Sequence, residues 1–308
     1  MDDRQKTELL QIAGRQIGFD FPMSQHTTFR VGGNAEALYE ASDPEGLSRV
    51  VSFLVDEGIP YLVAGRGSNL LVRDGGIGGV VIFLAGAFTD IQFEGSDYTD
   101  ISAGAGLSIV NLLIWCREKG VSGLEFLAGI PGSVGGAVAM NAGAFGKEIG
   151  PRVREIRLVS HHGQLTVRDR SLLRFSYRDL DLEAGVVITN VLFRLDRDTP
   201  KTVSARIAGC LKRRKETQPL EYPSAGSIFK NPRNDYAGRL IEQVGLKGKR
   251  IGGAMISNKH GNFIVNKGDA TATDILTLIN LAREEVKRTA GVQLELEIQI
   301  VGETVNGY

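Results

Sequence analysis

The first part of the chain alternates between helix-like and strand-like spacings of hydrophobic side chains. Residues 3–14 carry Leu9, Leu10 and Ile12 on one side and predict a short amphipathic helix. A second helix is predicted from Asp43 to about residue 58, because Asp43 suits the N-cap and the proline after it suits the first helical position. Short apolar runs between turn residues predict strands at 61–64, 80–84, 91–93 and 98–103, with a hairpin turn at 94–97 and a helix at 108–119.

Alternating apolar and polar positions return at 152–160 and 186–195 and predict two further strands, with a third at 164–167 after a turn. Residues 196–200 have the composition of a linker, and beyond them helices and strands alternate in a compact α+β pattern. The predicted elements there are helices at 202–217, 237–244 and 271–290 and strands at 262–265 and 294–301. We therefore expect an α/β and α+β fold with an N-terminal helix in 1–20, a main domain in 21–198 and a C-terminal domain in 199–308.

Composition excludes several classes of partner. The chain has 308 residues with 36 basic and 36 acidic side chains, so no global field attracts nucleic acid or a membrane surface. Its first residues lack the segments of a signal peptide, and no apolar run is long enough to span a membrane. Cys116 and Cys210 lie far apart, which favours a reducing compartment, and with four histidines they leave little material for a metal site. We expect a cytoplasmic protein without a metal.

Glycine changes this ordinary picture, because 39 of the residues are glycine and they gather in three loops beside apolar strands. Glycine lets the backbone approach a ligand closely and present N–H groups to phosphate oxygens. The loops at 65–69, 75–79 and 129–146 match neither the Walker A motif nor the three-glycine Rossmann fingerprint. They favour a nucleotide-containing ligand on a different fold, with tight turns that bind nothing as the alternative.

Polar residues in the second half could carry chemistry. Arg178 could pair with a carboxylate through its planar guanidinium, and Ser227 could place a hydroxyl against a substrate. Glu295 and Glu297 alternate with apolar residues, so both are expected on the same side of a strand, where one could be buried. Lys215 ends a basic helix that leads toward Ser227. Taken singly, each also fits a surface ion pair, a turn residue or a solvated face.

Taken together and in order, these segments resemble the UDP-N-acetylenolpyruvoylglucosamine reductases, the MurB family of peptidoglycan synthesis. The resemblance covers roughly residues 20–303. It implies that 21–198 is an FAD-binding domain of the vanillyl-alcohol-oxidase (PCMH) type, built from two α/β subdomains (about 21–88 and 89–198), and that 199–308 is a C-terminal domain that binds the UDP-sugar. The matching segments are Thr27-Thr28-Phe29-Arg30-Val31-Gly32-Gly33, 65–71, Gly129–Gly136, Asn141-Ala142-Gly143-Ala144, Tyr177-Arg178-Asp179, Ala225–Pro232 and Leu294-Glu295-Leu296-Glu297.

The resemblance also implies roles for individual residues. Only 49 positions separate the matched arginine and serine, which leaves no room for the tyrosine-bearing insertion of the type I branch, so the chain resembles type II. A histidine at position 260 fits the same branch. The matches are Arg178, Ser227 and Glu297 for catalysis, Tyr177, Lys215, Asn231 and His260 for the substrate, and Gly65, Arg66, Gly67, Ser68, Asn69, Leu70, Gly129, Ile130, Pro131, Gly132, Gly135, Gly136, Ala137, Asn141 and Gly143 for the cofactor.

The implied reaction reduces UDP-N-acetyl-3-O-(1-carboxyvinyl)-glucosamine to UDP-N-acetylmuramate, with FAD as cofactor and NADPH as co-substrate. Arg178 and Glu297 would stabilise charge at the substrate carboxylate, and Ser227 would protonate the α-carbon. We expect the FAD to be non-covalent, because all histidines and cysteines lie outside the glycine loops. We also expect a monomer that acts on small molecules. Two alternatives remain: another FAD oxidoreductase of the same fold, and a nucleotide-sugar-binding protein without catalysis.

Overall fold

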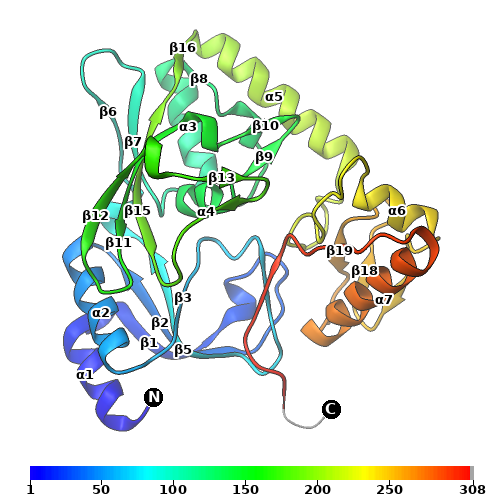
Figure 1. Ribbon diagram of the computed structural model, residues 1–308, viewed down its shortest axis with the longest axis horizontal. Coiled ribbons are helices and arrows are strands. Elements are labelled where there is room, and N and C mark those ends of the chain that lie inside the picture. Colours follow the sequence, from blue (N-terminus) through cyan, green and yellow to red (C-terminus); the bar gives the residue numbers. More distant parts are fainter. Residues whose placement is uncertain (306–308) are drawn as a thin grey trace. The chain divides into compact units, whose positions relative to one another are not determined.

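The computed structural model of the chain describes residues 1–305 and divides into two compact units (Figure 1). Unit 1 comprises residues 1–19, 37–66 and 79–212, and unit 2 comprises 20–36, 67–78 and the chain from 213 onward. The last change of unit lies inside helix α5 (Pro200–Thr217). The segments of unit 2 are therefore far apart in sequence, and its core joins the N-terminal and C-terminal parts of the chain.

Unit 1 begins with two helices and a four-stranded sheet. Helix α1 (Asp3–Ala13) and helix α2 (Pro44–Asp56) confirm the two predicted N-terminal helices, and Asp43 caps α2 through its side chain as expected. Leu9 and Leu54 are fully buried in the core that the helices and the sheet share. The strand order is β1 (Ile17–Pro22), β2 (Asn34–Ala41), β5 (Ile77–Leu84) and β3 (Tyr61–Val63).

A five-stranded antiparallel sheet forms the second layer of unit 1. The predicted hairpin at 94–97 is confirmed, because β6 and β7 pair across it. Helices α3 and α4 pack against this sheet, and Leu112, Val138 and Ile156 are fully buried in the shared core (Figure 1). The strand order is β12 (Leu165–Asp169), β11 (Val153–Val159), β15 (Val187–Arg194), β7 (Asp100–Gly104) and β6 (Ile91–Glu94), and the helices are α3 (Ile109–Lys119) and α4 (Val134–Ala139).

Two segments of unit 1 differ from the sequence prediction. The glycine-rich stretch 129–146 is predicted as a loop but contains helix α4, because Ser133 caps the first turn and Val134 and Val138 are buried. The expected linker at 196–200 begins instead with strand β16 (Asp196–Arg197), which pairs with β8 (Val121–Ser122). The first two residues of the expected linker are therefore held by backbone pairing to β8, which is distant in sequence and which composition cannot reveal.

Two small hairpins complete unit 1, and both turn within two residues. Strands β9 (Gly143–Ala144) and β10 (Lys147–Glu148) pair antiparallel around Phe145 and Gly146, which both have positive φ angles. Strands β13 (Phe175–Ser176) and β14 (Asp179–Leu180) pair in the same way around Tyr177 and Arg178. The predicted catalytic arginine therefore occupies the tip of a tight turn.

Unit 2 is an α+β unit around the antiparallel sheet β17-β18-β19. Helix α7 packs on β17 and β18, and Phe29 and Leu278 are fully buried in the core of the unit. Asp74 accepts hydrogen bonds from the first backbone N–H groups of α7, at 2.8 Å from Ala272. The elements are α6 (Ala237–Gln243), β17 (Arg250–Ile251), β18 (Ala254–Ile256), β19 (Ile264–Asn266) and α7 (Ala272–Ala290).

The predicted last strand is regular only at its end. Strand β20 (Gln299–Val301) pairs in parallel with β4 (Leu70–Val72), so the prediction is right there and wrong for 294–298. Residues 294–298 are extended but bond to the loop at 228–230 rather than to a neighbouring strand. None of the helices within residues 1–305 is both long and apolar enough to cross a membrane.

Candidate functional site

Gly65 and Ser133 bring two of the predicted cofactor loops together in unit 1. A Cβ atom at Gly65 would lie 2.5 Å from the Ser133 hydroxyl oxygen, so a larger residue here would displace the Ser133 side chain. The same hydroxyl accepts a hydrogen bond from the Gly136 N–H at 3.3 Å and so caps α4. Arg66 follows Gly65 and is exposed, with no hydrogen bond or ion pair to any of residues 1–305. Its guanidinium could bind an anionic ligand.

The third glycine loop contains glycines of two kinds. Gly135 donates its N–H to the Ala105 carbonyl at 2.8 Å, and a Cβ there would lie 2.8 Å from the Ala105 Cβ. Packing inside the protein therefore requires Gly135. Gly136 is exposed, and a Cβ there would meet only the Ser133 hydroxyl within 4 Å. Of the other predicted cofactor residues of this loop, Gly129 (φ 80°) and Pro131 are exposed, Ile130 and Gly132 are half-buried, and Ala137 is buried.

The end of the first glycine loop belongs to unit 2, and its backbone bonds to the segment that contains Thr28. Gly67 has a φ of 60°, and its carbonyl accepts the Thr28 N–H at 3.2 Å. The Thr28 hydroxyl is buried and has no hydrogen-bond partner within residues 1–305. A buried hydroxyl without a partner is costly unless a ligand satisfies it. Thr28 lies in one of the segments that resemble the family, but no role was expected for it from the sequence. Of the other predicted residues, Ser68 is half-buried and Leu70 is buried in β4.

The second glycine loop is a turn without a visible ligand role. In unit 2, a Cβ at Gly75 or Gly76 would collide with the backbone carbonyl of Glu303 or Asn34. In unit 1, a Cβ at Gly79 would collide with the Pro60 carbonyl. Close packing between backbone segments therefore explains these glycines, as the tight-turn alternative expects.

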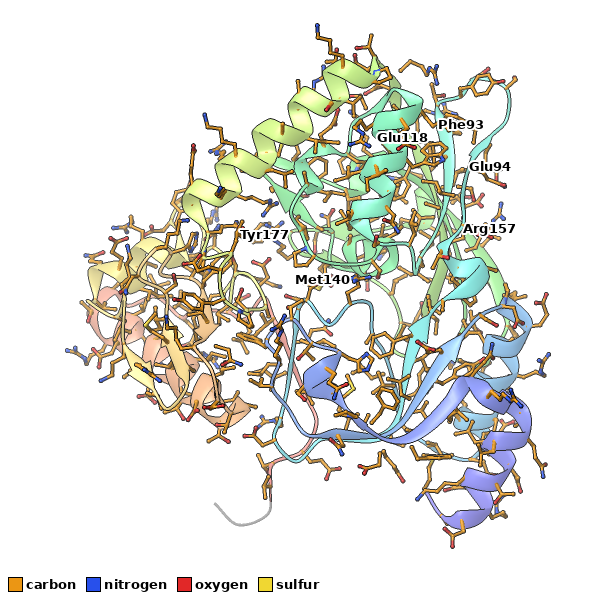
Figure 2. All side chains as sticks on the ribbon, turned by 180° about the vertical axis from the view of Figure 1, so that it is seen from behind. Phe93, Glu94, Glu118, Met140, Arg157 and Tyr177 are labelled. Atoms are coloured by element: carbon orange, nitrogen blue, oxygen red, sulfur yellow. The ribbon has the colours of Figure 1, made fainter. Side chains whose placement is uncertain are left out.

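Arg178 lies in the turn of the β13–β14 hairpin, which we call the arginine hairpin, and contacts hold both its side chain and the backbone before it. The Arg178 backbone has a φ of 59°, a left-handed conformation that costs non-glycine residues about 1–2 kcal/mol. Its guanidinium donates to the Gly143 carbonyl at 3.0 Å and lies 4.9 Å from the centre of the Tyr177 ring. The Asn141 side chain donates to the Ser176 carbonyl at 2.7 Å. Tyr177 is 43% exposed and stands near the hairpin tip, and it is labelled with Met140 in Figure 2.

The serine loop of unit 2 brings Ser227 and Glu297 onto adjacent backbone segments. The Glu297 N–H donates to the Ile228 carbonyl at 2.8 Å, and its own carbonyl accepts the Asn69 side-chain amide at 3.0 Å. Of the two glutamates, one of which could be buried, Glu297 is half-buried and Glu295 is exposed. The Ser227 hydroxyl makes no hydrogen bond with the described part of the chain. It is therefore available to donate to a ligand.

Asn262 holds the serine loop and was missed by sequence reasoning. It is 3% exposed and its side chain bonds both backbone groups of Phe229, accepting the N–H at 2.9 Å and donating to the carbonyl at 2.7 Å. Its own carbonyl accepts the Ile228 N–H, also at 2.9 Å. The sequence marks Asn262 only as the first residue of the strand predicted at 262–265, and nothing in it points to a supporting role.

His260 lies beside this loop as a neutral donor. Burial, and then the positive charge of Lys247, lowers the pKa of the imidazole below its usual value of 6.5. Its Nδ1 accepts the Asn262 N–H at 3.2 Å, which places the remaining proton on Nε2. His260 can therefore offer one N–H to a ligand without carrying charge.

Lys215 and Asn231 are the two other predicted substrate residues of unit 2, and they differ in how far their side chains are engaged inside the protein. The Lys215 side chain is exposed at the end of α5, and its backbone carbonyl accepts a hydrogen bond from the Lys259 ammonium group at 2.5 Å. The Asn231 side-chain oxygen accepts the Ala237 N–H at 3.1 Å, at the start of α6. Part of the hydrogen-bonding capacity of Asn231 is therefore used inside the protein.

A buried carboxylate precedes the third glycine loop. Glu125 is 6% exposed, and it accepts hydrogen bonds from the Ser122 hydroxyl and the Gly123 N–H, each at 2.8 Å. Burial alone would raise the pKa of Glu125, but these bonds and that from Arg206 on α5 outweigh it and lower the pKa. Glu125 stays ionised and fixes the chain four residues before Gly129.

The residues of each unit offer groups that suit a flavin nucleotide better than a metal. In unit 1, Gly136 offers exposed backbone and Arg66 an exposed cation without a partner among residues 1–305. In unit 2, Thr28 offers a buried hydroxyl without a partner among the same residues. Such groups suit the phosphates of a dinucleotide. Within residues 1–305, no group of three or more histidine, cysteine, aspartate or glutamate side chains could hold a metal ion.

Comparison with known proteins defines the class. Residues 35–168 match the family model of an FAD binding domain, and the fold resembles a variant of Phl p 4, a glucose dehydrogenase, with a TM-score of 0.50 at 12% identity over 64% of this chain and 44% of that chain. The chain is a flavoprotein with an FAD-binding fold of the vanillyl-alcohol-oxidase type.

The family follows from the rest of the chain. Residues 218–301 match the model of the UDP-N-acetylenolpyruvoylglucosamine reductase C-terminal domain. The reductase of Geobacter metallireducens is 45% identical over 98% of this chain and all of that relative, and that of Geobacter sulfurreducens is 43% identical over the same share of this chain. The crystal structure of MurB from Thermus caldophilus has a TM-score of 0.80 and 40% identity, over 91% of this chain and 97% of that one. The chain belongs to the UDP-N-acetylenolpyruvoylglucosamine reductase family, which confirms the resemblance seen in the sequence.

Proposed function

We propose that this chain reduces UDP-N-acetyl-3-O-(1-carboxyvinyl)-glucosamine to UDP-N-acetylmuramate with NADPH, a step of peptidoglycan precursor synthesis. FAD, when bound, would supply the hydride chemistry that links NADPH oxidation to reduction of the substrate's vinyl group. The observation that carries the proposal is the 45% identity to a named reductase over nearly the whole of both chains. A shared fold alone would not carry it, because one fold serves many reactions.

The proposed roles begin with the charge that develops on the substrate. When hydride adds to the terminal vinyl carbon, negative charge spreads from the α-carbon into the carboxylate. Arg178 would stabilise that charge with its planar guanidinium, and Glu297 would orient the carboxylate or donate to it when protonated. The guanidinium already donates to the Gly143 carbonyl, which limits its freedom.

Ser227 would then deliver a proton to the α-carbon and complete reduction of the double bond. Its hydroxyl has no hydrogen bond to the described residues, and the backbone on its C-terminal side is bonded to Asn262 and Glu297. A hydroxyl held in place but not otherwise used is what a proton donor requires. Lys215, Asn231, His260 and Tyr177 would bind the UDP-sugar.

The cofactor contacts are also part of the proposal. Gly65, Arg66, Gly67 and Gly136, together with the Thr28 hydroxyl, are the groups best suited to the phosphates of FAD. Asn69 and Gly143 would act indirectly, because Asn69 bonds the Glu297 carbonyl and Gly143 bonds Arg178. We expect a non-covalent flavin, which acid precipitation should release into the supernatant.

The test uses the purified protein and its visible spectrum. We expect a flavin spectrum and NADPH oxidation that requires the enolpyruvyl UDP-sugar. A flavin spectrum with NADPH oxidation but no response to this substrate would favour another FAD oxidoreductase, and the absence of bound flavin would contradict the proposal. We further expect a monomer in the cytoplasm. No disulfide joins Cys116 and Cys210, in keeping with a reducing compartment, and light scattering of the purified protein would test the monomer.

A further inference from the structure

Asn141 is a buried side chain that ties three segments of unit 1 together. It is 1% exposed and has a φ of 40°, a conformation that asparagine tolerates better than most residues. Its amide nitrogen donates to the Glu148 carboxylate at 2.9 Å and to the Ser176 carbonyl at 2.7 Å. Its amide oxygen accepts the Gly150 N–H at 3.0 Å. The chain after α4 is thereby joined to the β10 region and to β13.

These three bonds leave the Asn141 side chain little capacity for a ligand. Both N–H donors of the amide are used, and one of the two lone pairs on the oxygen is used. The reverse orientation of the amide would direct an oxygen at two acceptors, so the pattern of partners fixes it. With 1% exposure, the side chain is enclosed by its own partners and is poorly placed to contact a cofactor.

One of the partners leads directly to the arginine hairpin. Ser176 ends β13, and the turn Tyr177-Arg178 follows before β14 pairs back on β13 through Ser176 and Asp179. Arg178 has the left-handed φ that such a turn needs, which is unfavourable for an arginine unless surrounding contacts hold it. The Asn141 bond to the Ser176 carbonyl is such a contact.

A second attachment starts from the same segment. Gly143 lies two residues after Asn141, and its carbonyl accepts the Arg178 guanidinium at 3.0 Å. A Cβ at Gly143 would lie 3.0 Å from the Arg178 Nη1 atom. Residues 141–143 therefore fix both the backbone before Arg178 and the end of its side chain.

We propose that Asn141 is a positioning residue for Arg178, acting through the Ser176 carbonyl, rather than a residue that contacts the flavin. This inference rests on the role of Arg178 in the proposed function. A displacement of about 1 Å in a group that meets the reacting substrate can cost about 10²-fold in rate. Asn141 thus affects the step in which the substrate is reduced and not the step in which NADPH reduces the flavin.

The direct test is Asn141→Asp. Aspartate has the same size, also tolerates a positive φ and still accepts the Gly150 N–H, but it lacks the two N–H donors that bond Glu148 and Ser176. We expect normal FAD content and flavin reduction by NADPH within about 3-fold of the parent. Reoxidation of the reduced flavin by the enolpyruvyl UDP-sugar should slow by about 10–100-fold. Loss of FAD, or equal slowing of both half-reactions, would overturn the inference.

The matched control is Asn190→Asp, the same chemical change in the same unit. The Asn190 side chain accepts a hydrogen bond from the Ser102 hydroxyl at 3.0 Å, and aspartate can accept it too. We expect both half-reactions of this variant to match the parent. If Asn190→Asp slows reoxidation as much as Asn141→Asp, then a general charge effect and not positioning explains the result, and the inference fails.

A double-mutant cycle distinguishes failure of this inference from failure of the proposed function. In an Arg178→Ala background, Asn141→Asp should slow reoxidation by less than about 2-fold further, because the group it positions is gone. An undiminished effect there would mean that Asn141 acts elsewhere. If Arg178→Ala alone leaves reoxidation at the parent rate, the proposed role of Arg178 fails instead. Should Asn141→Asp not fold, Asn141→Gly takes its place, since glycine adopts the required φ freely.

Discussion

The arginine hairpin of unit 1 and the serine loop of unit 2 each depend on a buried asparagine, but in different ways. Asn141 joins three segments, and the hairpin it supports contains a residue with an unfavourable backbone conformation. The Asn262 side chain bonds both backbone groups of one residue, Phe229, and a second segment bonds the loop through the Glu297 N–H. The serine loop is therefore supported by two separate segments, whereas the bonds from Asn141 and Gly143 to the hairpin both come from residues 141–143. A single substitution should displace Arg178 more readily than Ser227.

The largest effect is expected from Ser227→Ala. Reoxidation of reduced flavin by the enolpyruvyl UDP-sugar should slow by about 10²–10⁴-fold, while flavin binding and reduction by NADPH stay intact. Ser227→Cys should retain more activity, because a thiol can still donate a proton. Stopped-flow measurement of the two half-reactions checks this, with Ser224→Ala as the control in the same turn. A raised KM with an unchanged chemical step would mean that Ser227 only shapes the loop.

Arg178→Lys should come next, with turnover lower by about 10²–10³-fold. Lysine keeps the charge but has a single ammonium group in place of the planar guanidinium, so it cannot present two parallel donors to a carboxylate. NADPH should still bleach the flavin at a near-parent rate. Turnover close to that of the parent would place Arg178 away from the reacting carboxylate.

Asn262→Ala sharpens the comparison by affecting stability more than chemistry. Two buried backbone groups of Phe229 would lose their partner, which costs about 1–3 kcal/mol for each group left unsatisfied. Urea unfolding should show the loss in the free energy of unfolding. Because other bonds still hold the loop, the variant that remains folded should reoxidise its flavin within about 10-fold of the parent. A larger loss of rate without a loss of stability would show that the serine loop lacks redundant support.

The smallest effect concerns pH and His260. Burial favours the neutral imidazole and lowers the pKa of His260 in the folded protein. As the pH falls, the unfolded chain therefore binds a proton at this histidine near pH 6.5, whereas the folded protein binds it only at a lower pH. The free energy of unfolding should therefore fall as the pH drops from about 6.5 toward the lower folded pKa. His260→Gln should weaken this dependence. Unfolding curves at several pH values check it, and an identical slope in the variant would assign the dependence to other groups.

The sequence predicted the elements whose signals are local. Asp43 followed by a proline marked the start of α2, and the turn at 94–97 marked the hairpin of β6 and β7. It predicted a strand over 294–298 wrongly, because apolar alternation reports an extended chain but not its partner, and here the partner is the loop at 228–230. The linker prediction at 196–200 also missed a partner that is distant in sequence, because the first two of these residues pair with β8.

The candidate site divides in the same way. The sequence shows where glycines gather. It does not show whether a ligand or the protein itself fills the space beside each one, and at Gly135 that space is filled by Ala105. The supporting roles of Asn141 and Asn262 also left no local signal, because each depends on partners up to 35 positions away. Family resemblance supplied the roles of Arg178, Ser227 and Glu297, which no spacing rule would have assigned.

The central claim is that the reduced flavin of this protein passes its electrons to an enolpyruvyl UDP-sugar. The most direct measurement reduces the purified protein with NADPH under anaerobic conditions and then mixes it with the substrate. The account predicts that the flavin absorbance returns and that one UDP-N-acetylmuramate forms for each flavin reoxidised. A flavin that stays bleached at saturating substrate, while oxygen still reoxidises it, would contradict the account.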